Sequence, residues 1–470
     1  MRLPRMTALI VLVLASACGN PPSYATTLTA PAAADPVPCT GSLNVAAQAA
    51  GPSDWPVYHR AADRRGVDPT LRSSHKPDPL WDLNLDGAMS AQPLLAQGML
   101  IEATEHDTVY ALDAATGCVY WQTSLGQAFA VPNHQQLCVN NIGPWLGVTS
   151  TPAIDPVARM IYVVAFFEPG RYEMDGLDLV TGAVRWRHPI DLPGADPLYQ
   201  LSRPAIQLDA GRAYASFGGR PGDCGQYHGF EVGIRTDGQG PQILYQVSPN
   251  REGAIWGTAG PVLLPDGDML VSSGNTDEAN AYDGSDSVIR LSPDLHRVDS
   301  FTPSNWKFLN QSDLDLGSIS PILVDGGHVF AVGKEGVGYL LDPNHLGGIG
   351  GQKFSQALSG GCYGIGALAY RAPLVFVPCD HSLTAVRMNG SRFDVAWRGP
   401  DFQAGSPIVA GGLVWTYDFT HGFLWALDPG SGAVKQKIAI GLGEHFVAPS
   451  SSAGRIYVPA KQHLIAFQVG

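Results

Sequence analysis

The acidic stretch TDEANAYDGSD, from Thr276 to Asp286, contains carboxylates that could bind Ca²⁺. Carboxylate and amide oxygens are the ligands that Ca²⁺ prefers. The same composition is also that of a solvated loop insertion, so both interpretations stay open. A second stretch, DLNLDG from Asp82 to Gly87, matches the first half of a calcium-binding loop, but its twelfth position is Pro93 instead of Glu.

Motifs of other chemistries are missing from the sequence. It contains no GxSxG, no HExxH and no phosphate-binding loop. GKEGVG (Gly333 to Gly338) and GCYGIG (Gly361 to Gly366) are rich in glycine, but we expect them in hairpins and not at strand-to-helix turns. A dinucleotide-binding fold is therefore disfavoured.

Seven cysteines suggest an oxidising compartment. There is no CxxC pair, which argues against a zinc ribbon or attached c-type haem. We expect Cys362–Cys379 to form a disulfide, because both lie on consecutive strands of one sheet unit. Cys138–Cys224 is the next expected pair and Cys39–Cys118 the remaining one, although six cysteines allow 15 pairings.

The N-terminus predicts export. Residues 1–17 combine a basic start, an apolar run and small residues, which is the pattern of a signal peptide. Cys18 then follows either as a lipidated lipobox cysteine or as a residue beside an ordinary cleavage site. Residues 18–52 read as this cysteine and a flexible tether. We expect a lipoprotein at the cell surface or in the periplasm, or a secreted protein. The net charge of −13 argues against nucleic acid or an anionic membrane surface as partners, so any membrane contact would be through a lipid anchor.

A repeated strand–turn–strand unit organises the rest of the chain. Its clearest copy is VYALDAATGCVYW, from Val109 to Trp121. Eight first strands of small residues recur, among them SAQPLL, TSTPAI, LSRPAI, TAGPVL and SISPIL, each followed by an apolar strand. This pattern predicts an all-β, eight-bladed β-propeller of four-stranded antiparallel blades over residues 53–470. The last unit lacks an outer strand, and the segment around Trp81 can supply it and close the ring. We expect a monomer.

The unit A-L-D-x-x-T-G-x-x-x-W resembles the repeat of the eight-bladed quinoprotein propellers. That superfamily includes pyrroloquinoline quinone (PQQ) alcohol dehydrogenases and non-enzymatic lipoproteins of outer-membrane assembly. The resemblance covers nearly the whole mature chain, and WPVYHRAADRRG, near its start, is similar too. The repeat indicates architecture and says little about chemistry, because its Asp, Thr, Gly and Trp tie turns and pack blades together.

The resemblance implies a cofactor site in the central channel. IWGTAGPVLLPDGDMLVSSGN is similar to the family stretch that begins with a Trp stacking on PQQ and ends with an Asn ligand of Ca²⁺, which gives Trp256 and Asn275. VVAFFEPG is similar to the stretch with the Glu ligand, which gives Glu168 after a gap of one residue. Ca²⁺ held there would polarise the quinone carbonyl.

The same resemblance supplies a base and a cation. SDLDLGSISPILV is similar to the strand that opens with the catalytic base, and spacing favours Asp315 over Asp313. GKEGVGYLLD places Lys334 at the quinone oxygens. Three departures count against catalysis. The vicinal Cys-Cys pair of many alcohol dehydrogenases is missing, Ala165 or its neighbour stands where a Ser precedes the Glu ligand, and no haem domain is fused to take the electrons.

Two functions follow. The first is a PQQ- and Ca²⁺-dependent dehydrogenase that oxidises an alcohol or sugar hydroxyl and passes electrons to an external acceptor. The second is a non-catalytic cell-surface propeller that binds a protein, peptide or glycan. Every site residue also has a structural interpretation: Trp256 as a core aromatic, Asn275 as a turn residue, the aspartates as blade-end ties, and Glu168 and Lys334 as solvated loop residues.

Overall fold

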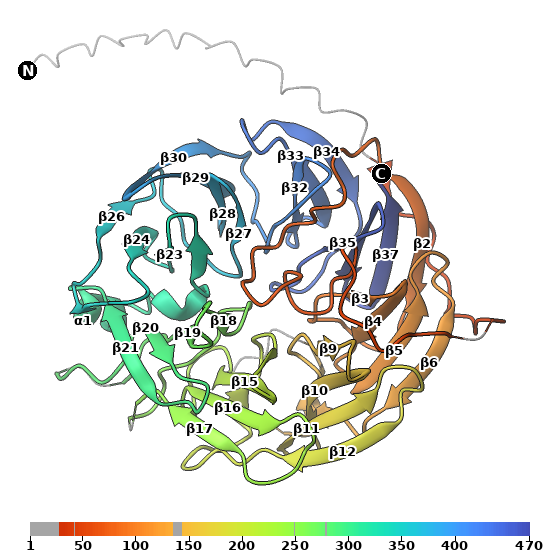
Figure 1. Cartoon of the computed structure of the whole chain (residues 1–470), viewed down its shortest axis with the longest axis horizontal. Helices are drawn as coiled ribbons and strands as arrows, with labels where there is room; N and C mark the ends of the chain where they lie inside the picture. Colours follow the sequence, from red (N-terminus) through yellow and green to blue (C-terminus); the bar gives the residue numbers. More distant parts are fainter. Residues whose placement is uncertain (1–27, 42, 135–142, 249, 278–279) are drawn as a thin grey trace, which may run out of the picture.

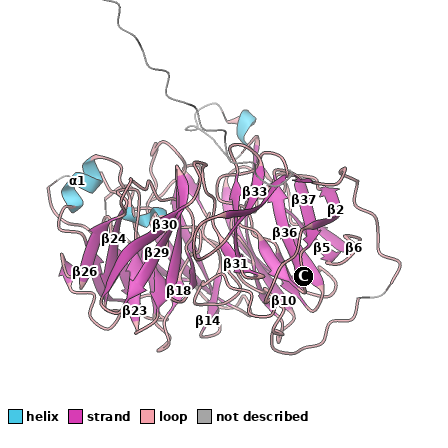
Figure 2. Ribbon diagram, turned by 90° about the horizontal axis from the view of Figure 1, so that it is seen from above, coloured by secondary structure: helices cyan, strands magenta, loops and turns pink. Residues whose placement is uncertain are grey.

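The chain folds into eight β-sheets arranged around one axis. The computed structural model describes residues 28–41, 43–134, 143–248, 250–277 and 280–470. Figure 1 shows the sheets as sectors of a ring, and Figure 2 shows the same ring edge-on. Each of these eight sheets has four or five strands. The predicted eight-bladed, all-β propeller is therefore confirmed.

The blades are numbered in chain order, with the strands of each given from the axis outward. Blade 1 consists of β3 (Leu94–Ala96), β4 (Met99–Ala103), β5 (Thr108–Asp113) and β6 (Val119–Ser124). Blade 2 consists of β9 (Ala153–Asp155), β10 (Met160–Phe167), β11 (Arg171–Asp178) and β12 (Val184–Pro189). Blade 3 consists of β14 (Gln207–Asp209), β15 (Arg212–Gly219), β16 (Phe230–Arg235) and β17 (Ile243–Gln246). Blade 4 consists of β18 (Val262–Leu263), β19 (Met269–Ser272), β20 (Val288–Leu291) and β21 (Arg297–Thr302).

The second half repeats this order. Blade 5 consists of β22 (Ile322–Val324), β23 (His328–Ala331), β24 (Val337–Leu341) and β26 (Phe354–Ala357). Blade 6 consists of β27 (Ala369–Arg371), β28 (Leu374–Cys379), β29 (Ser382–Asn389) and β30 (Arg392–Arg398). Blade 7 consists of β31 (Ile408–Ala410), β32 (Leu413–Asp418), β33 (Phe423–Leu427) and β34 (Val434–Ala439). Blade 8 consists of β35 (Ser450–Ser452), β36 (Arg455–Ala460), β37 (His463–Gln468) and β2 (Asp78–Asn84).

A few elements lie outside this plan. Blades 3, 4 and 7 each carry a fifth strand: β13 (Gln200–Leu201), β25 (Gly348–Ile349) and β1 (Leu28–Thr29). The others are the pair β7 (Phe129–Ala130) and β8 (Trp145–Leu146), the helix α1 (Trp306–Gln311), and two 3₁₀ turns at Val131–Asn133 and Leu316–Ser318.

The repeated Asp fixes the turn between the third and fourth strands of a blade. Asp113 Oδ1 accepts hydrogen bonds from the backbone N–H groups of Ala115 and Thr116 and from the Thr116 hydroxyl. Asp178 and Asp428 make the same set of bonds in blades 2 and 7. Such turns are a characteristic use of Asp, because its short side chain reaches its own backbone.

The repeated Gly and Trp join neighbouring blades. Gly182, which ends the blade 2 turn with φ +70°, leaves room for Trp121 of blade 1, since a Cβ there would lie 2.4 Å from the indole. Trp121 Nε1 also donates to the Leu179 carbonyl at 3.2 Å. Trp397 and Gly432 repeat this contact between blades 6 and 7. The repeat therefore positions blades, as its residue types indicate.

Small residues line the centre of the ring. Ala205, Ala259, Ala367 and Ala448 each lie just before an innermost strand and pack together around the buried Tyr58. The segment that carries Tyr58 crosses the centre of the ring in Figure 1. Arg64 holds it there by donating to the carbonyls of Tyr58, Ile206 and Pro261. The crowded centre explains why the first strands are poor in large side chains.

An N-terminal strap, Leu28–Cys39, runs along the outside of three blades. β1 pairs in parallel with β34, Ala34 bridges to Leu83 of β2, and Pro38 bridges to Val119 of β6. These partners are the outer strands of blades 7, 8 and 1, and β2 itself pairs with β37 to complete blade 8. The strap is therefore part of the folded body and not of the flexible tether expected for residues 18–52. The predicted signal peptide and Cys18 lie outside the described residues.

Two of the expected disulfides are present. Cys362–Cys379 joins the segment before β27 to the end of β28, with a Cα–Cα distance of 4.9 Å. Cys39–Cys118 fixes the end of the strap to the turn of blade 1, at 5.0 Å. Cys138 lies outside the described residues, so Cys138–Cys224 stays a prediction. Among the helices that are described, none is long and apolar enough to cross a membrane.

Candidate functional site

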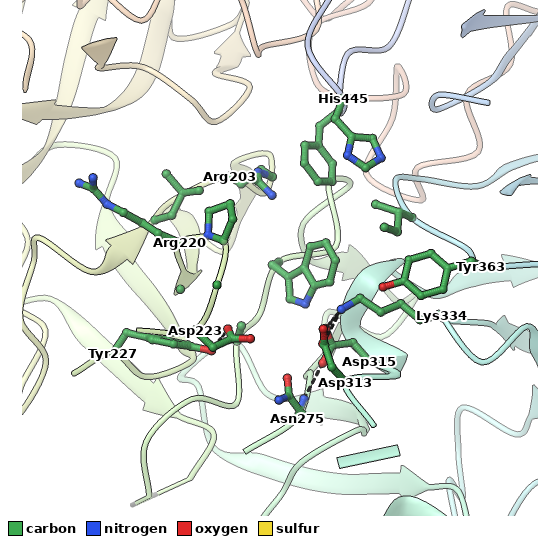
Figure 3. Close-up of a pocket in the computed structure, with 18 residues that line it drawn as sticks. Arg203, Arg220, Asp223, Tyr227, Asn275, Asp313, Asp315, Lys334, Tyr363 and His445 are labelled. Atoms are coloured by element: carbon green, nitrogen blue, oxygen red, sulfur yellow. Dashed lines mark hydrogen bonds and ion pairs between the residues drawn. The ribbon is translucent and has the colours of Figure 1, made fainter. Parts of the chain in front are cut away.

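A pocket with a cavity volume of about 250 Å³ lies where five blades converge. Its main side chains come from segments that lead into the innermost strands of blades 3, 4, 5, 6 and 8: Arg203, Trp256, Asp315, Tyr363 and Phe446. Lys334, between β23 and β24, completes the set (Figure 3).

Trp256 supplies an aromatic wall to this pocket. It is half-buried, and its ring lies 6.2 Å from that of Phe446 in an edge-to-face arrangement. The Lys334 Nζ is 5.2 Å from the centroid of the indole. Gly274 leaves room for Trp256 and Asp315 beside it, because a Cβ there would lie 3.2 Å from Trp256 Nε1 and 2.6 Å from Asp315 Oδ1. The predicted stacking residue therefore lies in the wall of a charged pocket.

Asp315, Asp313 and Lys334 form one ion-paired group. Lys334 Nζ lies 2.7 Å from Asp315 Oδ2 and 2.6 Å from Asp313 Oδ1. The backbone N–H of Asn275 donates to Asp315 Oδ1 at 2.7 Å. The Asp315 side chain is only 5% exposed and that of Asp313 is 59% exposed. The structure thus brings together four of the predicted residues and makes Asp315 the buried carboxylate.

Burial changes the proton affinity of this group. It raises the pKa of Asp315, and Lys334 and the Asn275 N–H only partly offset that effect. Burial alone would lower the pKa of Lys334, but the two carboxylates outweigh it and the net shift is upward. Burial also raises the pKa of the neighbouring Asp286 well above its usual range, and Asp315 adds to this. Asp315 is therefore a stronger proton acceptor than an ordinary Asp, as a general base should be.

Glu252 is a carboxylate that the sequence analysis missed. Its Oε2 accepts a bond from Asn275 Nδ2 at 3.4 Å, and Arg251 pairs with its other oxygen. Burial, together with the charges of Asp223, Asp277 and Asp315, raises the pKa of Glu252 to about 7 against the opposing effect of Arg251. Its backbone is in the left-handed region, with φ +77°. Strain of this kind at a non-glycine residue gathers at functional sites.

Glu168 does not share this pocket. Its carboxylate accepts from His134 and from the Ala130 N–H, each at 3.0 Å. Burial opposes these donors, but together they lower the pKa of Glu168. The predicted Ca²⁺ ligands Glu168 and Asn275 are therefore not brought together. In the described part of the chain, no group of three or more His, Cys, Asp or Glu side chains could hold a metal ion.

The acidic loop has protein partners for its described carboxylates. Asp283 accepts from Ser248, Asn250 and Thr276, and Asp277 pairs with Arg251. Residues 278 and 279 lie outside the described residues. In the DLNLDG stretch, Asp86 accepts from the hydroxyls of Thr104 and Thr108. Both stretches thus use their acids to fasten loops.

Arg203 lines the pocket and was also missed by the sequence analysis. It is 8% exposed, and its guanidinium stacks on Phe446 with 3.9 Å between Cζ and the ring centroid. A signal was present in the repeat: in SAQP, TSTP, LSRP, TAGP and SISP, the residue before Pro is large and charged only in the third copy. Departures from a repeat are where a propeller can place chemistry.

Comparisons with known proteins agree with this architecture. The family model described as outer membrane protein assembly factor BamB matches residues 77–216. The polyvinylalcohol dehydrogenase of a Pseudomonas species is 26% identical over an alignment of 309 residues, and the match covers 57% of this chain and 45% of that protein. The match thus spans less than half the length of that curated relative.

Solved structures share the fold at low identity. A quinohemoprotein alcohol dehydrogenase of Pseudomonas putida HK5 superposes with a TM-score of 0.71 at 13% identity, covering 91% of this chain and 83% of that one. The quinohemoprotein alcohol dehydrogenase of Comamonas testosteroni gives 0.67 at 14%, covering 89% and 80%. BamB of Moraxella catarrhalis gives 0.58 at 15%, covering 84% and 100%. The chain therefore shares the β-propeller fold of these proteins, and its residues 77–216 match the BamB family model.

Proposed function

We propose that the protein is an exported oxidoreductase that binds PQQ in the Trp256 pocket and oxidises a hydroxyl group of an alcohol or sugar. The observation that carries this proposal is the convergence of Trp256, Asn275, Asp315 and Lys334 in one pocket. A stacking surface, a buried base and a cation are the parts that such a reaction needs. A polyvinylalcohol dehydrogenase among the relatives supports a hydroxyl-bearing substrate.

The residues present fit PQQ, which is a planar quinone with several carboxylates. Trp256 offers a face for a planar ring, and Lys334 and Arg203 offer two positive charges. Arg203 Nη2 is buried without a hydrogen-bond partner, so the pocket has an unused donor for an anion. Bound PQQ would supply a quinone that accepts two electrons from the substrate.

The chain's own groups would then handle the proton. Asp315 Oδ2 takes the hydroxyl proton, and burial favours its protonated form. Lys334 Nζ, which lies 2.7 Å from Asp315 Oδ2, would donate to the quinone oxygens. The Asn275 N–H keeps Asp315 Oδ1 in place at 2.7 Å, which orients the other oxygen.

Calcium does not fit the described residues. Glu168 is held by His134 outside the pocket, and both oxygens of Asp315 already have donors. We therefore assign no step to Ca²⁺. An electron acceptor outside the chain would reoxidise the cofactor.

A second candidate is a non-catalytic propeller, exported and either lipidated at Cys18 or secreted, that binds a protein, peptide or glycan. The match of residues 77–216 to outer membrane protein assembly factor BamB favours it. In that case the ion pair between Asp315 and Lys334 would be structural.

Titration of the purified protein with PQQ separates the two candidates. Binding should raise the melting temperature by mass action and quench tryptophan fluorescence. Dye reduction would then be followed with a panel of alcohols, sugars and polyvinyl alcohol, with and without Ca²⁺. Absence of binding at micromolar PQQ would exclude the oxidoreductase.

Three variants assign the roles. Trp256→Ala should weaken PQQ binding, whereas the matched control Trp145→Ala, at an exposed Trp outside this pocket, should not. Asp315→Asn should leave PQQ bound and abolish dye reduction. Retained turnover in Asp315→Asn would remove that residue from its role.

A further inference from the structure

Arg203 is a buried cation without a counter-ion. Its guanidinium lines the pocket, and no ion pair or hydrogen bond from it exists among the described residues. Burial lowers the pKa of Arg203 to about 10, and the more distant carboxylates of Glu105 and Glu444 oppose this only in part. A buried guanidinium that is neither paired nor hydrogen-bonded destabilises a protein unless a ligand completes it.

The neighbouring carboxylates do not fill this need. Glu105 already accepts bonds from Ser90, Gly147 and Thr149, at 2.6, 3.0 and 2.9 Å. Burial and the charge of Glu105 raise the pKa of Glu444 to about 7, against Lys461 and Arg203. Neither carboxylate lies within ion-pair distance of Arg203. The positive charge of Arg203 is thus available to the pocket.

Arg203 lies away from the Asp315 group, with aromatic rings between them. Figure 3 shows Arg203 and His445 at one side of the pocket and Asp315, Asn275 and Lys334 at another. The contacts run from Lys334 to Trp256 at 5.2 Å, from Trp256 to Phe446 at 6.2 Å, and from Phe446 to Arg203 at 3.9 Å. A ligand that contacts both Arg203 and the Asp315 group therefore needs a ring to lie over the aromatic side chains and an anionic group to meet Arg203.

Arg220, the other unpaired arginine of the pocket lining, is aimed elsewhere. Its three guanidinium nitrogens have no hydrogen-bond partner, but the group packs on the rings of Phe129 and Phe166, at 5.2 and 5.4 Å. In Figure 3 its side chain extends away from Lys334 and Asp315. Arg203 is therefore the arginine placed to meet a ligand that lies over the aromatic rings.

We propose that Arg203 binds a carboxylate of the ligand that occupies this pocket. Guanidinium and carboxylate match in a planar, two-bond geometry. The carboxylate could come from an acidic sugar as substrate or from a quinone tricarboxylate as cofactor. Only the choice between these two sources rests on the function proposed above.

The test compares ligands that differ by one carboxylate. D-galacturonate, D-galactose and PQQ are titrated by calorimetry into the full-length protein and into Arg203→Gln, Arg203→Lys and Arg387→Gln. Arg387, in β29, is exposed and serves as the control for loss of one positive charge. Arg203→Gln should weaken binding of a carboxylate ligand about tenfold or more, with Arg203→Lys in between. Galactose binding and Arg387→Gln should show no such change.

The outcomes separate the sources and the proposals. Loss for galacturonate with unchanged PQQ affinity assigns Arg203 to a substrate acid, and the reverse result assigns it to the cofactor. Without ligand, Arg203→Gln should keep or raise the melting temperature, because an uncompensated charge is removed. A lower melting temperature, unchanged affinity for both acids, or no binding of either acid by the native protein would overturn the proposal. Failure of PQQ alone to bind would remove the oxidoreductase and leave Arg203 tested by galacturonate.

Discussion

Lys334 Nζ lies 2.7 Å from Asp315 Oδ2 in a pair whose side chains are 8% and 5% exposed. The same ammonium also holds the exposed Asp313. Loss of one partner from a buried ion pair is far more harmful than loss of an exposed pair, because the other charge stays behind without compensation. The pair therefore links the stability of blade 5 to the chemistry proposed for the pocket.

Lys334→Met should lower the free energy of unfolding by about 3–5 kcal/mol, because Asp315 would be left charged and buried. Urea unfolding at neutral pH measures this. The control is Lys353→Met, which removes an exposed pair with Asp342 at 3.4 Å and should change stability by about 1 kcal/mol or less. The loss in Lys334→Met should shrink in acid, where Asp315 can be protonated. Equal losses in the two variants would contradict a buried pair.

Gly182→Ala should destabilise the protein more than Gly211→Ala. Both glycines have a positive φ, +70° and +73°, so alanine is strained at either position by about 1–2 kcal/mol. A Cβ at Gly182 would also meet Trp121 at 2.4 Å, whereas nothing lies within 4 Å at Gly211. The clash should add about 1–3 kcal/mol in urea unfolding. Equal effects would mean that the contact between Trp121 and the next blade is not tightly packed.

The fold could be predicted because the repeated residues themselves make the contacts that form each turn and join neighbouring blades. Asp113 and Thr116 form the turn of blade 1 by local hydrogen bonds. Trp121 contacts the corresponding turn of blade 2, which the next copy of the repeat forms. Such contacts depend on residue type and spacing, which the sequence shows directly. Trp256, Asn275, Asp315 and Lys334 could be found as a set because a family resemblance aligned them.

Three features could not be predicted, for physical reasons. The strap pairs through its backbone, so a run of Ala, Pro and Thr gives no side-chain pattern to detect. Glu168 is taken by His134 and Ala130, which belong to a segment between blades that the repeat does not describe. The repeat shows Arg203 as an exception among the first strands, but only its surroundings show that no acid reaches it. For the strap and for Glu168, the decisive partner is distant in sequence.

Removal of Cys39–Cys118 should cost more stability than removal of Cys362–Cys379. The two disulfides close segments with sequence separations of 79 and 17 residues. Each should contribute about 2–5 kcal/mol, and the longer segment should add about 1 kcal/mol through its larger loss of chain entropy in the unfolded state. Chemical unfolding of the double Cys→Ser variants measures both. The first variant should also free the strap, and exposed outer strands should then promote self-association. A monomer by light scattering would show that β1 and β34 stay paired without the disulfide.

Stability should fall as the pH rises from about 5 to about 9, because several carboxyl groups are held protonated by burial. Burial raises the pKa of Glu231 from 4.5 to about 8, and the Ser216 hydroxyl offsets this only partly. A folded-state pKa above the unfolded one means that the stabilisation is complete below pH 4.5 and is lost as the pH rises through 8. Asp175 and Glu252, whose pKa values burial raises to about 7, act in the same direction.

Glu231→Gln isolates one of these groups. Since a pKa unit corresponds to about 1.4 kcal/mol, the variant should lose a few kcal/mol less than the native protein between pH 5 and pH 9 in urea unfolding. The amide keeps an acceptor for Ser216, which donates to Glu231 at 2.6 Å. The control Asp401→Asn changes an acid that is 86% exposed and should leave the pH dependence as it is. If Glu231→Gln and the native protein lose stability in parallel, Glu231 is ionised in the folded state and its burial must be compensated by a donor within blade 3.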